Sequence, residues 1–419
     1  MKKIGSYERN SIIVFALTMI ANVCNYCFQI IVGKMMLVEE YAQVNTILAI
    51  VSIFSIPTTI ITMICARYIA LNYAEKNEEN IISVMKILMK MVFVMGMIVA
   101  VILLVGGRMI SSVFGLYSSK YLAGVFIVTF VNMVYAITTG SLQGMKKFVP
   151  YGIQSIATAG GKVVFSVAFI LIGWSVGGVI AGIIIGIIIA IAIGVKYIYR
   201  YIISAIKNNN PNNIDINEFF RFALGTLVAQ GCVIALTNGD VLLVKAYFSD
   251  TEAGLYSSAM VIGKIAMYVS SAVIATLFPT VVEQHERGND TTPLFRKAML
   301  YGGGVAVLCA IGMVLFGKLV IGILFGAKYL QAIEYLPAVC AFVVPLTFIT
   351  ILMNYSLAIN ETKEFNVLIA MGLVGIIVGG YFVHDTVGHL LYMVGGILLA
   401  VFVISYIILK IRKRKNVKV

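Results

Sequence analysis

Apolar stretches of about 20 residues recur from one end of this chain to the other, and no feature constrains the fold more. An α-helix of that length crosses the hydrocarbon core of a bilayer, where every backbone polar group must be hydrogen-bonded within the protein. We therefore predict an all-α polytopic membrane protein without a sizeable soluble domain. The twelve predicted transmembrane helices cover 11–33, 41–66, 82–105, 119–140, 149–172, 176–199, 218–247, 253–282, 296–317, 331–358, 365–383 and 389–410.

Charged residues make up only 12% of the chain, against roughly 25% in soluble proteins, and their distribution predicts the orientation. Lysine and arginine are concentrated in the loops on the side of the N-terminus and in the tail KIRKRKNVKV. By the positive-inside rule, both termini lie in the cytoplasm. The net charge of +13 then reflects orientation and contact with anionic membrane lipids, and we expect no nucleic-acid partner.

The second half of the sequence repeats features of the first half at a nearly constant offset. Lys34 matches Lys245 at 211 positions, and Glu40 matches Glu252 at 212. Each half holds six predicted spans, an even number, so both halves enter the membrane in the same direction. We expect two six-helix lobes related by a pseudo-twofold axis along the membrane normal, with a site between them, as in transporters. The predicted divisions are an N-terminal lobe at 1–205, a cytoplasmic linker at 206–217, a C-terminal lobe at 218–411 and a basic tail at 412–419.

Several predicted spans carry polar side chains along one face. In the first span, Asn22, Asn25 and Gln29 are spaced three and four residues apart, so they share one side of the helix. Asn132 in the fourth span and Gln230 in the seventh are further amides within apolar surroundings. Polar stripes of this kind either join helices to one another or line a hydrophilic interior, and both interpretations stay open for the hydroxyl residues.

Three charges lie well inside predicted spans: Lys162, Asp240 and Lys264. A charge at that depth costs at least about 2.5–3.5 kcal/mol on insertion scales, so it normally faces water or a partner. We expect these residues to face a wet cavity; the alternative is a structural ion pair of Asp240 with Lys264 or Lys245. Because lysine exceeds carboxylate here, such a cavity attracts anions and repels organic cations.

Glycine and proline mark two further features of the predicted helices. Gly178, Gly182 and Gly186 recur every four residues, which predicts a seam where another helix packs closely. Pro57 and Pro279 fall in the second span of each half and predict bends there, either at a gate or as static curvature.

The stretch NGDVLLVKAYFSDTEAGLYSSAMVIGK contains the most specific pattern, in which Asp240, Lys245, Glu252 and Tyr256 take part. VGKMMLVEEYAQVNTILAI, PTTIITMICARYIALNYAEKNEEN, SLQGMKKFVPYGIQ and FPTVVEQHERGN accompany it along most of the chain. Together these stretches resemble the polysaccharide-transporter branch of the multidrug/oligosaccharidyl-lipid/polysaccharide (MOP) exporter superfamily.

The resemblance implies a flippase of the bacterial cytoplasmic membrane that moves undecaprenyl-pyrophosphate-linked oligosaccharide units from the inner to the outer leaflet by alternating access. Such a headgroup cannot cross hydrocarbon unaided, because its charges and hydroxyls would lose their water. Lys162 and Lys264 would then neutralise the diphosphate, and Asp240 would receive a coupling H+ or Na+ or balance Lys264. The other predicted cavity residues are Asn22, Asn25, Gln29, Asn132, Gln230, Lys34 and Arg67.

Two other functions stay open. A cation-coupled multidrug antiporter of the same superfamily would need more carboxylates within the membrane, and a membrane-embedded polysaccharide polymerase or ligase would need a large outer loop with catalytic residues. The sequence has no phosphate loop for ATP, and we expect neither enzymatic activity nor a metal or cofactor. Expected partners are the lipid-linked oligosaccharide, membrane lipids, and the polysaccharide polymerase and glycosyltransferases that act on the same polymer.

Overall fold

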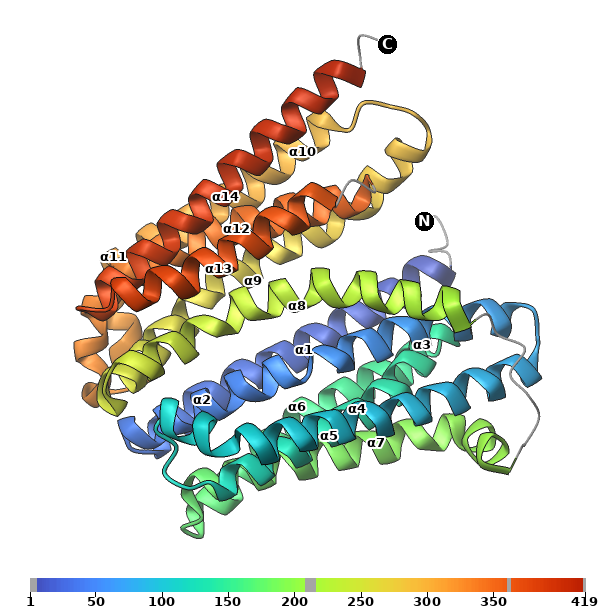
Figure 1. The fold of residues 1–419 in the computed structure, drawn as a ribbon, viewed down its shortest axis with the longest axis horizontal. Helices are drawn as coiled ribbons and strands as arrows, with labels where there is room; N and C mark the ends of the chain where they lie inside the picture. The colour runs from blue at the N-terminus through green and yellow to red at the C-terminus, as the bar shows by residue number, and fades with distance from the viewer. Residues whose placement is uncertain (1–5, 208–215, 360–362, 417–419) are drawn as a thin grey trace. The chain divides into compact units, whose positions relative to one another are not determined.

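The computed structural model describes the backbone of residues 6–207, 216–359 and 363–416. Side chains are described for 16–206, 231–270 and, apart from short gaps at 283, 286 and 360–363, for 280–411. Within the described backbone all regular structure is helical, and no strand occurs (Figure 1). The predicted all-α fold class is therefore confirmed.

Cα distances divide the chain into two compact units, Met1–Ile234 and Ala235–Val419. The division falls inside helix α8 (Ile216–Tyr247), later in the chain than the predicted linker at 206–217. Because 208–215 lie outside the described residues, the predicted lobe boundaries stay a prediction.

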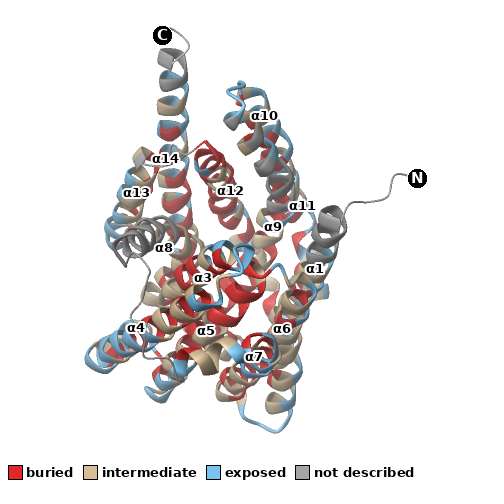
Figure 2. Ribbon diagram, turned by 90° about the vertical axis from the view of Figure 1, so that its right-hand side faces the viewer, coloured by how far each residue is buried: buried red, intermediate tan, exposed pale blue. Residues whose placement is uncertain are grey.

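Unit 1 consists of long helices joined by short turns. Helix α6 packs between α1 and α7, and α5 packs against α3, α4 and α7. A run of consecutive buried residues in α5, Ala136–Leu142, shows that protein surrounds this part of the helix on all sides (Figure 2). The helices before α8 are α1 (Ser6–Met35), α2 (Val38–Phe54), α3 (Ile56–Ala74), α4 (Glu78–Val113), α5 (Lys120–Gly144), α6 (Phe148–Leu171) and α7 (Ser175–Lys207).

The second predicted span, 41–66, is a broken helix. Helix α2 ends at Phe54, α3 begins at Ile56, and the two are bent by 46° at Ser55. Pro57 in the first turn of α3 has no N–H to continue the hydrogen-bond ladder of α2, and the chain resumes with Thr58 N–H donating to the carbonyl of Ser55 at 2.9 Å. The bend predicted from Pro57 is therefore confirmed; Pro279 lies outside the residues with described side chains.

The predicted glycine seam joins α7 to α6. A Cβ atom added to Gly182 would lie 2.4 Å from the backbone nitrogen of Ser166, and one added to Gly186 would lie 2.7 Å from the backbone nitrogen of Lys162. Real Cβ atoms do not approach backbone that closely, so only glycine permits this distance between the helices. The seam fixes the position of α6, the helix that carries Lys162.

Unit 2 is built around α12, which packs against α9, α11 and α14 and carries many buried apolar side chains. The chain enters it through α8 and continues into α9, and the two parts of the ninth predicted span, α10 and α11, are joined by a π-helical turn. Its elements after α8 are α9 (Asp250–Glu286), α10 (Thr292–Ala298), η1 (Met299–Gly303), α11 (Gly304–Leu324), η2 (Ala327–Tyr335), α12 (Leu336–Ala358), α13 (Lys363–Phe382) and α14 (Val387–Asn416).

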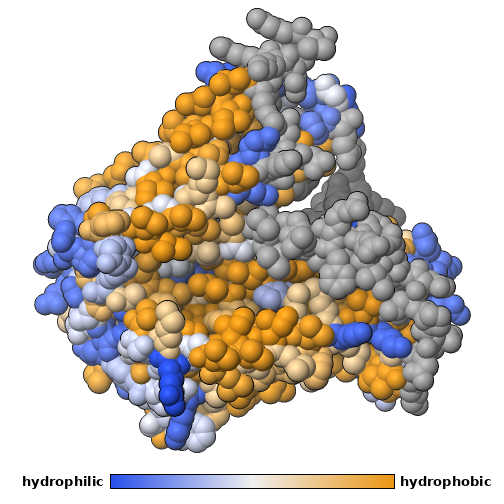
Figure 3. Space-filling view, in the orientation of Figure 1, coloured by the Kyte–Doolittle hydropathy of each residue, from blue (hydrophilic) through white to orange (hydrophobic). Residues whose placement is uncertain are grey.

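The helices have the length and apolar surface of membrane spans. Nine helical segments of the described residues meet that description, and counting α2 with α3 as one bent span makes ten. The other two predicted spans correspond to α8 and α9, which include residues without described side chains, so the part described is consistent with twelve. On the visible face of Figure 3, hydrophobic residues cover the middle of the helices. Large apolar side chains are widely exposed in the described residues; Leu104 and Val105 of α4 are each 82% exposed. Such exposure is expected where lipid replaces water as the solvent.

Candidate functional site

Lys162 lies midway along α6, and its ammonium group contacts α1. The Nζ atom is 4.5 Å from the ring centroid of Phe28, which is 1% exposed, while Lys162 itself is half-buried. This is a cation–π contact, worth about 0.5–2 kcal/mol depending on how far the cation is desolvated.

Lys162 has no carboxylate partner: among the residues whose side chains are described, none forms an ion pair with it. The ring of Phe28 offsets only part of the cost of an ammonium within a membrane, at least about 2.5–3.5 kcal/mol on insertion scales. An ammonium also has three hydrogen-bond donors, and an aromatic face satisfies them poorly. The group is therefore suited to an additional, anionic partner.

The predicted polar stripe of α1 adjoins this lysine. Phe28 is three residues from Asn25 and adjacent to Gln29 in sequence, and residues three apart are neighbours on a helix surface. Asn25 and Gln29 are half-buried, and Asn22 is exposed. Tyr41 in α2 donates a hydrogen bond of 3.1 Å to Gln29 Oε1, which uses the acceptor of that amide and orients its NH₂ group. The packing of α1 on α6 thus places Lys162 on the face of α1 that Phe28 occupies, which borders the face of the stripe at Asn25.

The other predicted cavity residues of unit 1 lie elsewhere. Lys34 is exposed in the last turn of α1, and Arg67 is exposed on α3 close to the turn into α4. Since α1 and the broken helix α2–α3 run in opposite directions, these two residues lie at opposite ends of the unit (Figure 1). Asn132 is half-buried in the middle of α5.

In unit 2, Asp240 of α8 is a buried carboxylate. Its side chain is 5% exposed, and Tyr256 of α9 donates a hydrogen bond of 2.6 Å to Oδ2. Lys264, two turns further along α9, is half-buried and acts electrostatically on the carboxylate. The second oxygen, Oδ1, has only backbone of its own turn nearby and makes no hydrogen bond of good geometry with the described residues.

Lys245 does not pair with Asp240. It forms an ion pair with Asp250 at the start of α9. The alternative in which Asp240 forms a structural ion pair with Lys245 was therefore wrong. Lys245 and Asp250 flank the short turn between α8 and α9, whereas Asp240 lies more than a turn deeper in α8. Gln230, the remaining predicted site residue, lies outside the residues with described side chains.

A related hydrogen bond occurs at matching positions of the two units. Gln29 and Asp240 are 211 positions apart, the same offset as Lys34 and Lys245, and each accepts a hydrogen bond from a tyrosine of the following helix. The tyrosines themselves, Tyr41 and Tyr256, are 215 positions apart and therefore do not match. Sequence reasoning missed both tyrosines. Tyr256 belongs to the family-like pattern, but nothing in the pattern says which residue its hydroxyl meets.

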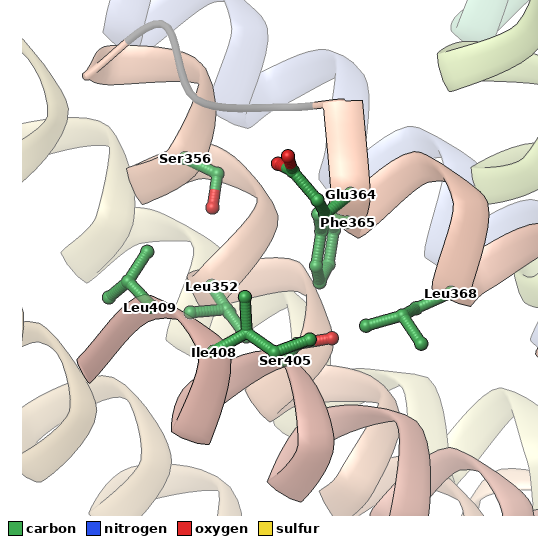
Figure 4. A pocket seen from close by; sticks show the side chains of 8 residues that line it. All are labelled: Leu352, Ser356, Glu364, Phe365, Leu368, Ser405, Ile408 and Leu409. Carbon is green, nitrogen blue, oxygen red and sulfur yellow. The ribbon is translucent and has the colours of Figure 1, made fainter. Parts of the chain in front are cut away.

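A pocket in unit 2 lies apart from the predicted residues. It is formed by the ends of α12 and α14 that meet the start of α13, and the hydroxyl of Ser405 beside it has no hydrogen-bond partner among the described residues (Figure 4). No group of three metal-ligating side chains occurs in the described part of the chain. The lining residues are Leu352, Ser356, Glu364, Phe365, Leu368, Ser405, Ile408 and Leu409.

Compact helical units and helices apolar enough to span a membrane define a multi-pass α-helical membrane protein, and one of those helices carries Lys162. Solved structures of two such proteins have the same fold at 13% sequence identity. One, a multidrug resistance MATE family transporter of the MOP superfamily in an inward-facing conformation, matches with a TM-score of 0.78 over 97% of this chain and 99% of its own. The lipid II flippase MurJ, in an inward closed conformation, matches with a TM-score of 0.69 over 95% of this chain and 87% of its own.

The chain belongs to the polysaccharide biosynthesis protein family, whose model matches residues 8–285. A curated relative, Inner membrane protein YghQ of Escherichia coli (strain K12), is 27% identical over 113 residues, which is 27% of this chain and 32% of that protein. The chain thus aligns with about a third of the length of that relative. The family match and the shared fold confirm the resemblance inferred from the sequence.

Proposed function

We propose that this protein is a flippase for oligosaccharide units carried on a polyprenyl diphosphate, in the cytoplasmic membrane and with both termini in the cytoplasm. The observation that carries the proposal is Lys162: an ammonium midway along an apolar helix, packed against the helix that carries the amide stripe, without a carboxylate partner among the described residues. An unbalanced cation beside hydrogen-bonding amides is complementary to a headgroup that joins diphosphate to sugar.

The physical task of such a protein is to replace the water of the headgroup during passage. Phosphate charges and sugar hydroxyls lose several kcal/mol of hydration if they enter hydrocarbon unaided, about 4–8 kcal/mol for a single hydroxyl or amide transferred to cyclohexane. In the proposed site, Lys162 neutralises the diphosphate, while Asn22, Asn25 and Gln29 bind sugar hydroxyls. The polyprenyl tail stays in the bilayer, so the protein needs to enclose only the headgroup.

Asp240 and Lys264 supply the coupling in this proposal. While the carboxylate is ionised, it compensates the ammonium of Lys264. When Asp240 takes up a proton or a sodium ion, that compensation is lost, and Lys264 becomes available to the diphosphate as a second cation. Ion uptake and substrate binding are then linked through one pair of residues, with Tyr256 holding the carboxylate in place. The polymerase and glycosyltransferases of the same polymer are the expected functional partners.

The test is a Lys162→Ala variant in a strain that depends on the gene for its surface polysaccharide. We expect the polymer to disappear and lipid-linked repeat units to accumulate in the inner leaflet while the protein level holds. Lys162→Arg keeps the charge and should retain part of the activity. Lys90→Gln, which removes an exposed lysine of α4, is the matched control and should leave the polymer intact. Full polymer in the Lys162→Ala strain would refute the role of Lys162.

A further inference from the structure

The aromatic ring of Phe28, against which the Lys162 ammonium packs, is not part of the polar stripe. We propose that Phe28 is a positioning residue, which holds the Lys162 ammonium while the site is empty and gives it up to the diphosphate of the substrate. This inference rests on the proposed function, because it concerns binding of the same substrate at the same lysine.

Phe28 is placed so that it can act as a fixed platform. Its side chain is 1% exposed, and α1 packs along α6. The ring is therefore held by its surroundings. Lys162 is different, because its ammonium ends a flexible four-carbon chain and can change partners by rotamer changes alone.

The strength of the contact suits a temporary partner. A cation–π contact is favourable, and more so away from water, but a charge-assisted hydrogen bond to a phosphate oxygen is stronger and also satisfies an N–H donor. A diphosphate can therefore displace the ring, whereas a neutral sugar cannot. Phe28 in this way reserves the ammonium for anionic ligands.

The ring also affects release of the substrate. When the diphosphate leaves, Lys162 returns to Phe28 instead of staying without any partner in the membrane interior. The ring thus lowers the free energy of the empty state and does not contribute to the bound state. Removing it should make the empty state less favourable, so the substrate should bind more tightly and leave more slowly.

The experiment compares Phe28→Leu with the wild-type chain in nanodiscs, by titration with undecaprenyl diphosphate that carries no sugar. Leucine keeps an apolar side chain and removes the aromatic face. We expect the Kd to fall by roughly threefold to tenfold, the change that corresponds to the loss of one cation–π contact. In proteoliposomes, kcat and KM for flipping should fall together. Phe28→Tyr keeps a ring of nearly the same size and should stay close to wild type.

A merely structural role of Phe28 predicts the opposite sign, because a loosened site binds more weakly. Weaker or unchanged binding by Phe28→Leu would overturn the proposal. Phe28→Leu is also made in a Lys162→Gln background, where it should have no effect on binding; the same change in both backgrounds would show that the ring acts independently of the lysine.

If Lys162→Gln alone binds like wild type, the proposed function itself fails. If Lys162→Gln loses binding and Phe28→Leu weakens it, only the role of Phe28 is overturned.

Discussion

Among the described residues, one side chain, that of Tyr256, donates a hydrogen bond to Asp240. The residue at the matching position of the first half is neutral. Gln29 is an amide and accepts from Tyr41. A hydrogen bond to a charged group contributes about 1.5–3 kcal/mol, against about 0.5–1.5 kcal/mol between neutral groups. The same substitution at the two tyrosines should therefore have unequal effects.

We predict that Tyr256→Phe slows flipping about tenfold or more, because the coupling carboxylate loses its only side-chain donor among the described residues. Tyr41→Phe should slow it severalfold at most. Initial rates of transport of a polyprenyl-diphosphate lipid in proteoliposomes measure both, with protein folding checked by size-exclusion chromatography. Equal losses in the two variants would show that charge on residue 240 is irrelevant to the function.

Sequence reasoning at the scale of single residues found charges and missed their partners. Lys162, Lys264 and Asp240 stand out because ionised side chains are rare in apolar helices. Phe28 does not stand out, since a phenylalanine in a membrane span is ordinary. Its contact with a lysine 134 residues away depends on how α1 and α6 are packed, and helical periodicity within one span carries no such information.

At the scale of helices, the seam between α6 and α7 fixes the lysine-bearing helix. We predict that Gly182→Leu destabilises the protein by about 1–3 kcal/mol or more, because its side chain would collide with the backbone of Ser166. Gly177→Leu is the matched control, since a Cβ atom there meets nothing within 4 Å. Thermal unfolding in detergent measures the difference. An unfolding temperature for Gly182→Leu equal to that of the control would mean that the helices separate without cost.

The length of the apolar stretches in the sequence predicted the positions of the helices, but not the points at which a helix is interrupted. The span 41–66 is two helices with a 46° bend, and the span 296–317 begins in α10 and passes through a π-helical turn. Pro57 gave a local reason to expect the first break. The π-helical turn Met299–Gly303 was not predicted, although three consecutive glycines, Gly302, Gly303 and Gly304, make the helix easier to deform there.

For the molecule as a whole, the bilayer explains why so much of the fold was predictable. It requires helices of defined length with every backbone group satisfied, and this requirement is visible in composition and repeats. The same fold at 13% identity in the MATE transporter and MurJ shows that the pattern, rather than individual residues, specifies it. The site was less predictable, because it depends on which helix faces meet. Lys245, for example, meets Asp250 across a turn instead of Asp240.

The substrate class can be tested on the intact molecule through its stability. A ligand that binds only the folded protein stabilises it by about 2.7 kcal/mol at a hundredfold excess over Kd. We predict that undecaprenyl diphosphate raises the unfolding temperature of the wild-type chain in nanodiscs by a measurable amount, and that Lys162→Ala removes most of this rise. Undecaprenol, which has the same tail without phosphate, is the control ligand. An uncompensated ammonium repels cations, so ethidium should not stabilise the protein. Stabilisation by ethidium, undiminished in Lys162→Ala and absent with the diphosphate lipid, would instead favour the multidrug antiporter.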